Sequence, residues 1–141
     1  MATTLYPRTI LQTSYKNYLS KYHSLNLYLD DKNNYADWHH INMFYSNKPN
    51  QIIDLSFDKY NLGKKGILKR KLTIFDKETI YYVASYARAM FEWLHDFSTL
   101  RIYDIKELMF EKPILKELLH YFQLHNCNLC KQYLECKSQW D

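Results

Sequence analysis

The residues best suited to chemistry lie close together near the carboxyl end of the chain. The sequence contains three cysteines, and all of them fall between positions 127 and 136. Cys127 and Cys130 form a C-x2-C loop, which places two thiolates on one side of a tight turn at a separation that suits tetrahedral zinc. Cys136 would return from the following helix as a third ligand. This spacing favours a metal site.

A histidine would complete a Cys3His site, and two candidates lie nearby. His120 precedes Cys127 by a six-residue spacer and could swing in from the end of the preceding helix. His125 is two residues from Cys127, which crowds the ion without forbidding the ligand. We favour His120 and keep His125 as the alternative fourth ligand. Four protein ligands leave no open position for water, so the expected role of this one Zn²⁺ ion is structural.

Two other interpretations of the cysteines stay open. Free cysteines pack readily as small hydrophobic residues, so the cluster could consist of plain thiols. Alternatively, Cys127 and Cys130 could be a redox couple at a helix N-terminus, where the helix dipole lowers the pKa of the attacking thiol. Against redox use, no strand is expected before the motif, as a thioredoxin-like unit would require.

A second group of candidate residues is basic. Five of the eight residues at 64–71 are lysine or arginine, and the net charge of the chain is +4. On a ribbon these side chains could follow a phosphate backbone and gain affinity by releasing counterions, or the run could serve as a nuclear address. The alternative is a solvated hairpin face, because lysine at a sheet edge is a common device against aggregation. The candidate nucleic-acid-binding residues are Lys64, Lys65, Lys69, Arg70 and Lys71.

Other titratable clusters point less clearly to a site. Glu92 and His95 have the spacing found in di-iron bundles, but such a site needs a second copy, so we expect a solvent-facing pair. His39 and His40 point about 100° apart on a helix and cannot easily share one ion. The sequence lacks a Gly-rich phosphate loop, a G-x-S-x-G motif and paired catalytic carboxylates. We therefore expect a non-enzymatic protein without a small-molecule substrate.

The first half of the chain is predicted to contain two helices and a hairpin. Apolar residues recur at helical spacing over 8–22 and about 35–46. Apolar and polar residues alternate over 51–57 and 66–75, which indicates two strands joined by a connection at 58–65. A ribbon of two strands is only marginally stable in isolation, so it must lie against helices.

The second half is predicted to be helical. Asp76 is expected to cap a long helix that ends near Phe97, and a short helix follows at 103–110. Pro113 suits the first position of a helix that runs to about Leu124. A last helix is expected from Asn128 to Trp140.

Together these elements predict a fold that is mainly α with a small β-hairpin (α+β), a helical domain with a C-terminal Cys/His zinc clip. Aromatic residues make up 17% of the chain, which is typical of a folded protein. The two glycines and three prolines give no sign of a linker. We expect one domain at 1–141, with N-terminal helices at 8–46, the hairpin at 51–75, helices at 76–124 and the Cys/His cluster at 120–136.

The sequence also bears on where in the cell the protein resides. No run of residues reaches the length of about eighteen apolar residues that a membrane span needs, and the N-terminus does not resemble a secretory signal. We therefore expect an intracellular protein, nuclear or cytoplasmic, with no membrane partner. In a reducing compartment its thiols stay free for metal.

The His/Cys cluster, the length and the Tyr/Asn/Lys-rich character resemble the small RING-like or zinc-bearing nucleocapsid assembly proteins of baculoviruses, insect viruses with large DNA genomes. The resemblance rests on Cys127, Cys130 and Cys136. It implies a capsid-associated protein of the infected nucleus and the virion. A true RING needs eight ligands, so ubiquitin-ligase activity is not implied.

The leading functional expectation is a structural or assembly protein stabilised by one zinc ion, with other protein subunits as partners. Tyrosines at helical spacing could serve such contacts, because tyrosine offers apolar area with a polar tip, although they could equally line the core. The alternatives are a nucleic-acid-binding accessory factor that meets DNA or another acidic surface through 64–71, and a C-x2-C thiol redox protein.

Overall fold

The structure is a computed structural model, and it describes residues 4–25, 27, 44–75, 77–97 and 112–135. Both helices and strands make up a substantial part of these residues. The fold is α+β, and the predicted class, mainly α, is wrong because strands form a large part of the described chain, including residues 77–84, which were expected to be helical. The strands are β1 (Tyr6–Pro7), β2 (Tyr45–Ser46), β3 (Ile67–Ile74) and β4 (Lys77–Ala84). The helices are α1 (Lys21–Leu25), α2 (Tyr86–Phe97), α4 (Lys112–His125) and α5 (Asn128–Glu135).

A hairpin of β3 and β4 forms the larger sheet. The strands are antiparallel, and their register runs from Ile67 opposite Ala84 to Ile74 opposite Lys77. The prediction that 66–75 is a strand is confirmed, but its partner is 77–84 and not 51–57. The long helix expected from Asp76 is therefore wrong over its first half. The sequence from Thr79 to Val83 is β-branched or aromatic throughout, which suits a pleated, half-buried surface.

The segment predicted as a helix at 8–22 is not helical up to Ser20; it bends at 15–17, and only its end enters α1. Tyr18 exchanges two backbone hydrogen bonds with Ser56. On its other side, Leu19 bonds to β4, where its amide donates to the Tyr82 carbonyl and its carbonyl accepts from the Ala84 amide. The chain therefore runs between the 51–57 segment and β4, so Tyr18 and Leu19 are both fully buried.

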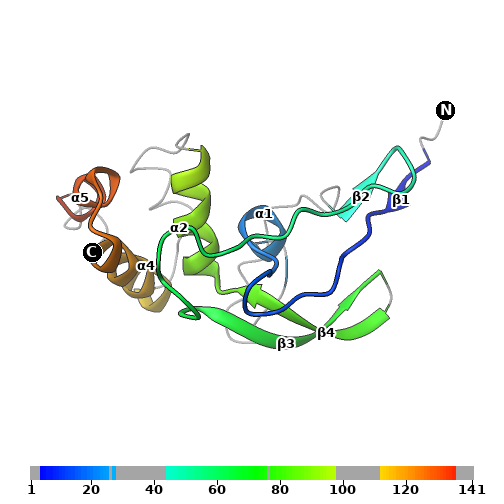
Figure 1. The fold of residues 1–141 in the computed structure, drawn as a ribbon, viewed down its shortest axis with the longest axis horizontal. Coiled ribbons are helices and arrows are strands. Elements are labelled where there is room, and N and C mark those ends of the chain that lie inside the picture. The colour runs from blue at the N-terminus through cyan, green and yellow to red at the C-terminus, as the bar shows by residue number, and fades with distance from the viewer. Residues whose placement is uncertain (1–3, 26, 28–43, 76, 98–111, 136–141) are drawn as a thin grey trace.

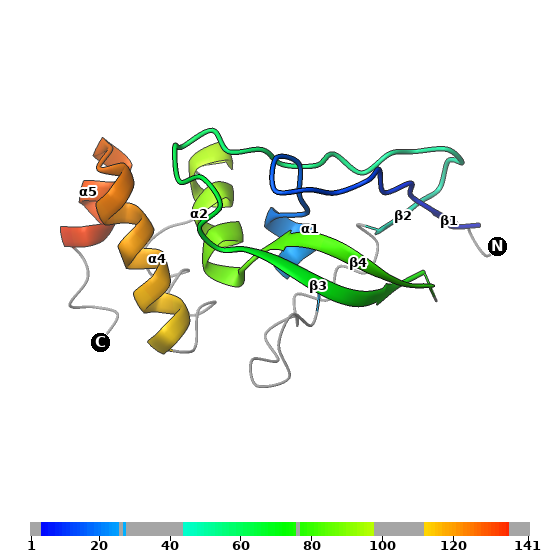
Figure 2. The ribbon, with the colours of Figure 1, turned by 60° about the horizontal axis from the view of Figure 1, so that its bottom comes forward.

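Helix α2 is the centre of the core. The Ser85 hydroxyl accepts a hydrogen bond from the Arg88 amide, so Ser85 caps the helix in place of the predicted Asp76. The residues from Val83 to Leu94 are all buried, because α2 lies between α1 and α4 (Figure 2). A helix surrounded in this way needs apolar residues on more than one face.

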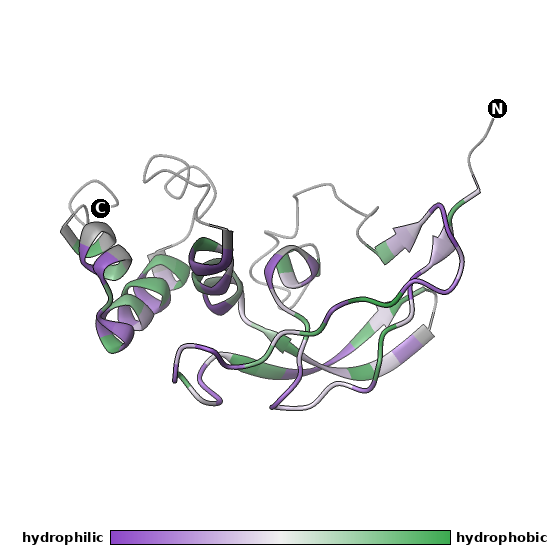
Figure 3. Ribbon diagram, turned by 45° about the horizontal axis from the view of Figure 1, so that its top comes forward, coloured by the Kyte–Doolittle hydropathy of each residue, from purple (hydrophilic) through white to green (hydrophobic). Residues whose placement is uncertain are grey.

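Residues 112–125 and 128–135 are helical, as predicted. Pro113 lies in the first turn of α4, and α5 begins at Asn128. Helices α4 and α5 lie at the opposite end of the molecule from the β1–β2 ribbon (Figures 1 and 2). Figure 3 shows that both helices have apolar and polar sides, as expected of helices that cover a core.

Several predictions fall partly or wholly outside the described residues. The helix predicted at 103–110 is one of them, and so is the end of the last helix beyond Glu135. Of the helix predicted at about 35–46, only the last residues are described, and Tyr45–Ser46 belong to β2. Within the described part of the chain, the helices are too short or too polar to cross a membrane.

Candidate metal centre

Three helices bring two histidines and two cysteines to one place. His95 lies in the last turn of α2, and His125 is the last residue of α4. Cys127 precedes α5, and Cys130 lies in its first turn. Asn126 joins the helices with a φ of 51°, a left-handed conformation that asparagine tolerates better than most residues. This tight turn points the cysteines back toward α2.

The donor atoms are close enough to share an ion. Ligand atoms of His95, His125 and Cys127 all lie within 4.8 Å of one another. Cys130 is not in that group, but its Sγ is 2.8 Å from the Cys127 Sγ and 3.5 Å from the His95 Nε2. The His95 Nε2 is 3.3 Å from the Cys127 Sγ.

These separations can be compared with those around tetrahedral zinc. Bond lengths of about 2.3 Å to sulfur and about 2.0 Å to nitrogen place sulfur and nitrogen about 3.5 Å apart, and two sulfurs about 3.8 Å apart. The two nitrogen–sulfur distances already agree with this geometry. To ligate one zinc ion, the two sulfurs would have to move apart by about 1 Å. They are too far apart for a disulfide, whose S–S bond is about 2.05 Å, and both cysteines are free.

The His95 ring is oriented as a metal ligand would be. Its Nδ1 lies 2.8 Å from the Phe91 carbonyl oxygen. Since that oxygen can only accept, Nδ1 carries the proton and Nε2 presents its lone pair to the sulfurs. A hydrogen bond from the second nitrogen to a backbone carbonyl is the usual way in which proteins orient ligand histidines. Burial lowers the pKa of His95, which favours the neutral form that binds metal.

Aromatic rings enclose the two histidines. The His95 ring centroid lies 4.1 Å from that of Phe91 and 4.9 Å from that of Tyr60, and Tyr60 also contacts His125 at 5.3 Å. Cys130 is fully buried, and burial together with the hydrogen bond to Cys127 raises the pKa of its thiol to about 12. A cation at this position would offset that cost, because metal binding deprotonates the thiols it ligates.

The candidate site contains some of the residues in the predicted ligand set. It brings Cys127 and Cys130 together and places His125, the alternative fourth ligand, beside them. His120 is exposed and does not belong to the group, while Cys136 lies outside the described residues. His120 lies in α4 more than one turn before His125, so its side chain leaves the helix in another direction.

Sequence reasoning missed His95 as a candidate ligand. It had been grouped with Glu92 as a solvent-facing pair, and that expectation is wrong, because Glu92 is 2% exposed and His95 is half-buried. The position of His95 in the last turn of the helix was the available signal, but nothing local indicated that the cysteines, 32 residues later, fold back onto it.

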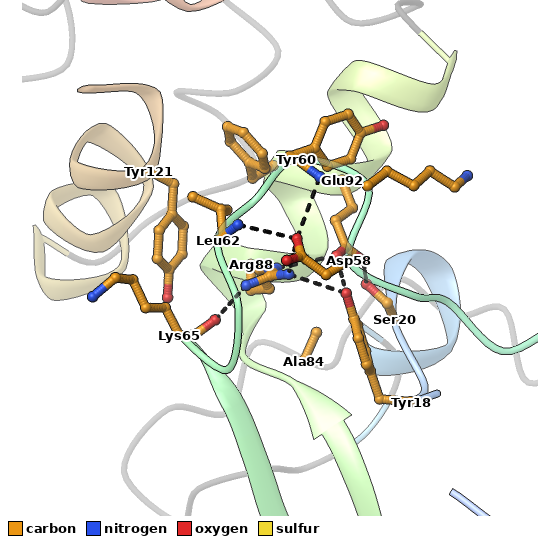
Figure 4. A network of polar contacts seen from close by, with 12 residues as sticks. Tyr18, Ser20, Asp58, Tyr60, Leu62, Lys65, Ala84, Arg88, Glu92 and Tyr121 are labelled. Carbon is orange, nitrogen blue, oxygen red and sulfur yellow. Dashed lines mark hydrogen bonds and ion pairs between the residues drawn. The ribbon is translucent and has the colours of Figure 1, made fainter. Parts of the chain in front are cut away.

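A buried polar network supports the helix that carries His95 (Figure 4). Arg88 is fully buried, and its Nε donates to Glu92 at 3.0 Å. Its Nη2 donates to Asp58 at 3.1 Å and to the Tyr18 hydroxyl at 3.2 Å. Tyr18 and Ser20 both donate to the Glu92 carboxylate. The network therefore ties α2 to two segments that precede it by 30 residues or more.

Asp58 also shapes the loop that carries Tyr60. Its carboxylate accepts hydrogen bonds from the amides of Tyr60, Leu62 and Gly63. Burial opposes the charged form, but the amides of Gly63 and Leu62 and the charge of Arg88 outweigh it, so the pKa of Asp58 lies below its ordinary value. The loop holds the Tyr60 ring against both histidines, and the Tyr60 hydroxyl donates to Asp96.

The five predicted nucleic-acid-binding residues are all exposed. Lys64 and Lys65 lie in the turn before β3, and the other three lie on β3. Comparisons of the chain with protein-family models, with curated proteins and with solved structures find no match. The resemblance to baculovirus proteins thus stays an expectation from the sequence.

Proposed function

We propose that the protein is a non-enzymatic structural protein in which one zinc ion joins α2, α4 and α5. His95, His125, Cys127 and Cys130 would be the four ligands. The observation that carries the proposal is the grouping of His95, His125 and Cys127, whose donor atoms lie within 4.8 Å of one another, with the Cys130 Sγ 2.8 Å from that of Cys127. Imidazole and thiolate are the donors that zinc prefers in structural sites.

The ligand set supports a structural role over a catalytic one. A catalytic zinc keeps one position open for water or substrate, whereas here four protein atoms would fill a tetrahedral shell. The packed rings of Tyr60 and Phe91 cover the histidines, which restricts the access of a substrate to the ion.

The ion would stabilise the fold by linking residues that are distant in sequence. His95 and Cys127 are 32 residues apart. Closing a loop of this length costs chain entropy, which the metal–ligand bonds would offset. For a site of this kind the free energy of metal binding is part of the free energy of folding. The C-terminal helices would then depend on zinc more than the hairpin does.

A role in assembly is supported by an exposed apolar face near the N-terminus. Thr9 pairs with Ile52, so their side chains share one side of the extended segments, and Leu11 follows on the same side two residues later. Leu11 and Ile52 are each 53% exposed. Contiguous exposed apolar surface is typical of protein–protein contact sites. We assign this face to contacts with other subunits, which is the role that the resemblance to nucleocapsid assembly proteins implies.

Metal analysis of the purified full chain tests the zinc site. We expect one zinc ion per chain, and with Co²⁺ in its place the absorption bands of a tetrahedral thiolate site. His95→Asn and Cys130→Ser should lose the ion. His120→Asn is the matched control, because it changes an exposed histidine of α4 and should retain the ion.

Two results would contradict the proposed ligands. One is zinc well below one ion per chain in protein purified without chelators. The other is a loss of zinc in His120→Asn with retention in His95→Asn, which would favour the ligand set predicted from the sequence. Cys136→Ser completes the comparison, and we expect it to keep the ion.

Sedimentation velocity tests the assembly face. We expect the wild-type chain to self-associate with rising concentration and Ile52→Lys to shift it toward the monomer. Leu124→Lys is the control, because Leu124 is 47% exposed on α4, away from the paired segments. Equal sedimentation of all three proteins, with no larger species, would contradict self-assembly through this face.

A further inference from the structure

The β3–β4 hairpin divides the basic run between its two faces. Lys69 lies opposite Tyr82 and Lys71 opposite Ile80, whereas Arg70 lies opposite Tyr81. Because cross-strand partners point to the same side of a sheet, Lys69 and Lys71 share a face with Tyr82, and Arg70 projects from the other face. The sequence had suggested that all five charges could contact one phosphate chain, but their division between two faces prevents this.

A second tyrosine reaches this face from the N-terminal segment. The Tyr82 amide donates to the Thr13 hydroxyl at 2.9 Å, which holds that segment along β4. The Tyr15 ring then meets the Tyr82 ring edge to face, with centroids 4.7 Å apart. Tyr15 is 39% exposed, so the residue is accessible to a ligand.

Lysines surround the two rings. The Lys64 Nζ lies 4.8 Å from the Tyr15 ring centroid, and the Lys69 Nζ lies 5.9 Å from that of Tyr82. Lys71 pairs with Glu78 at 3.2 Å, which neutralises the charge toward the tip of the hairpin. In the part of the chain that the structure describes, Lys64 and Lys69 form no ion pair. Their positive charge is thus available at the end of the face where the tyrosines lie.

We propose that the face formed by Tyr15, Tyr82, Lys64 and Lys69 binds single-stranded nucleic acid. Lysines that are free of carboxylates can contact phosphates, and an exposed tyrosine ring next to them can stack on a base. This combination of a basic surface with aromatic rings is typical of proteins that bind single strands without sequence preference. A duplex would present only its phosphates here, because its bases are already stacked on one another.

The site is independent of the proposed zinc centre. It is built on the hairpin and the N-terminal segment, whereas the His/Cys group lies between α2, α4 and α5. Each site can therefore be removed without changing residues of the other.

Fluorescence anisotropy with a labelled oligothymidylate tests the proposal, using the full chain and, for comparison, the same strand annealed into a duplex. We expect the single strand to bind more tightly than the duplex at about 50 mM salt. The affinity should fall as salt rises. Each phosphate contact adds about 0.7 to the slope of log affinity against log salt, so Lys64→Gln/Lys69→Gln should reduce that slope by about 1.4.

Matched variants distinguish binding at this face from general electrostatic attraction to the protein. Lys48→Gln/Lys116→Gln removes the same charge from exposed lysines elsewhere and should leave the affinity almost unchanged. Tyr15→Leu should weaken binding about tenfold, the usual cost of losing one stacked base, without changing the salt slope.

Three outcomes would overturn the proposal. The first is no binding of the single strand at low salt. The second is equal loss of affinity in the two double-lysine variants, which would show that only net charge matters. The third is unchanged affinity in Tyr15→Leu together with equal binding of single strand and duplex, which would show that no base stacks on the face.

Discussion

Replacing Glu92 with glutamine removes the buried negative charge that faces Arg88 while keeping the size of the side chain. Glu92 is 2% exposed, and Arg88 is fully buried. The Glu92 carboxylate accepts hydrogen bonds from Tyr18, Ser20 and Arg88. Glutamine offers one acceptor oxygen in place of two and turns an amide toward these donors. We therefore expect the helix that carries His95 to lose its main polar support.

The magnitude follows from the partners that remain. Breaking a buried ion pair by removing one partner costs about 3–5 kcal/mol, because the other charge stays buried without compensation. Arg88 keeps Asp58, at 3.1 Å, as a partner. We therefore expect the lower end, a loss of about 3 kcal/mol, from a total stability of about 5–15 kcal/mol for a domain of ordinary size.

Urea denaturation followed by circular dichroism measures the effect. With an m-value of about 2 kcal/mol/M, a loss of about 3 kcal/mol lowers the midpoint by about 1.5 M urea. Glu78→Gln is the control, because Glu78 pairs with Lys71 at 3.2 Å but its side chain is 57% exposed. An exposed pair contributes less than about 1 kcal/mol, so this variant should unfold close to the wild type.

A midpoint for Glu92→Gln no lower than that of Glu78→Gln would refute the reasoning. A double-mutant cycle with Arg88→Met refines the test. If the two side chains interact as the structure shows, the two losses will not add, and the coupling will exceed about 0.5 kcal/mol.

Three further predictions concern pH, a glycine and the proposed ion. The pKa of Asp58 in the folded protein lies below its ordinary value of 3.8, so the ionised carboxylate stabilises the fold at pH values above 3.8. This contribution is lost as the pH falls through the folded-state pKa. When unfolding is followed against pH, Asp58→Asn should therefore lose less stability in acid than the wild type. Gly66→Ala should lower the urea midpoint more than Gly63→Ala: both glycines have positive φ, at a cost of about 1–2 kcal/mol for alanine, but only at Gly66 would a Cβ collide with the Tyr121 hydroxyl. A chelator should lower the thermal midpoint of the wild type and leave that of His95→Asn unchanged, because only the wild type would have an ion to lose.

Several features could be predicted because neighbouring residues decide them. Pro113 suits the first turn of a helix wherever the helix packs, and α4 begins there as expected. The two residues between Cys127 and Cys130 bring the sulfurs together within one turn. Alternating side chains at 66–75 predicted a strand, which the structure contains as β3.

Tertiary contacts decided the rest. The residues from Val83 to Leu94 match a helical spacing throughout, yet the chain changes from strand to helix at Ser85, because β3 provides a partner for Ile80 and its neighbours. Tyr18 and Leu19 fit a helical stripe as well as they fit an extended chain between two others. For Tyr18 and Leu19, local spacing cannot separate these possibilities, because the hydrogen bonds that select one come from residues 38 and more positions away.

The same limit applies to the candidate site. Sequence spacing alone identified the pair of thiols and the basic run. It did not bring His95 to the thiols or divide the lysines between two faces, since both depend on packing and register between segments that are distant in sequence. Short-range geometry is set by covalent connections along the chain, whereas the packing of α2 on α4, which brings His95 to the C-x2-C turn, is set by the burial of side chains from many elements at once.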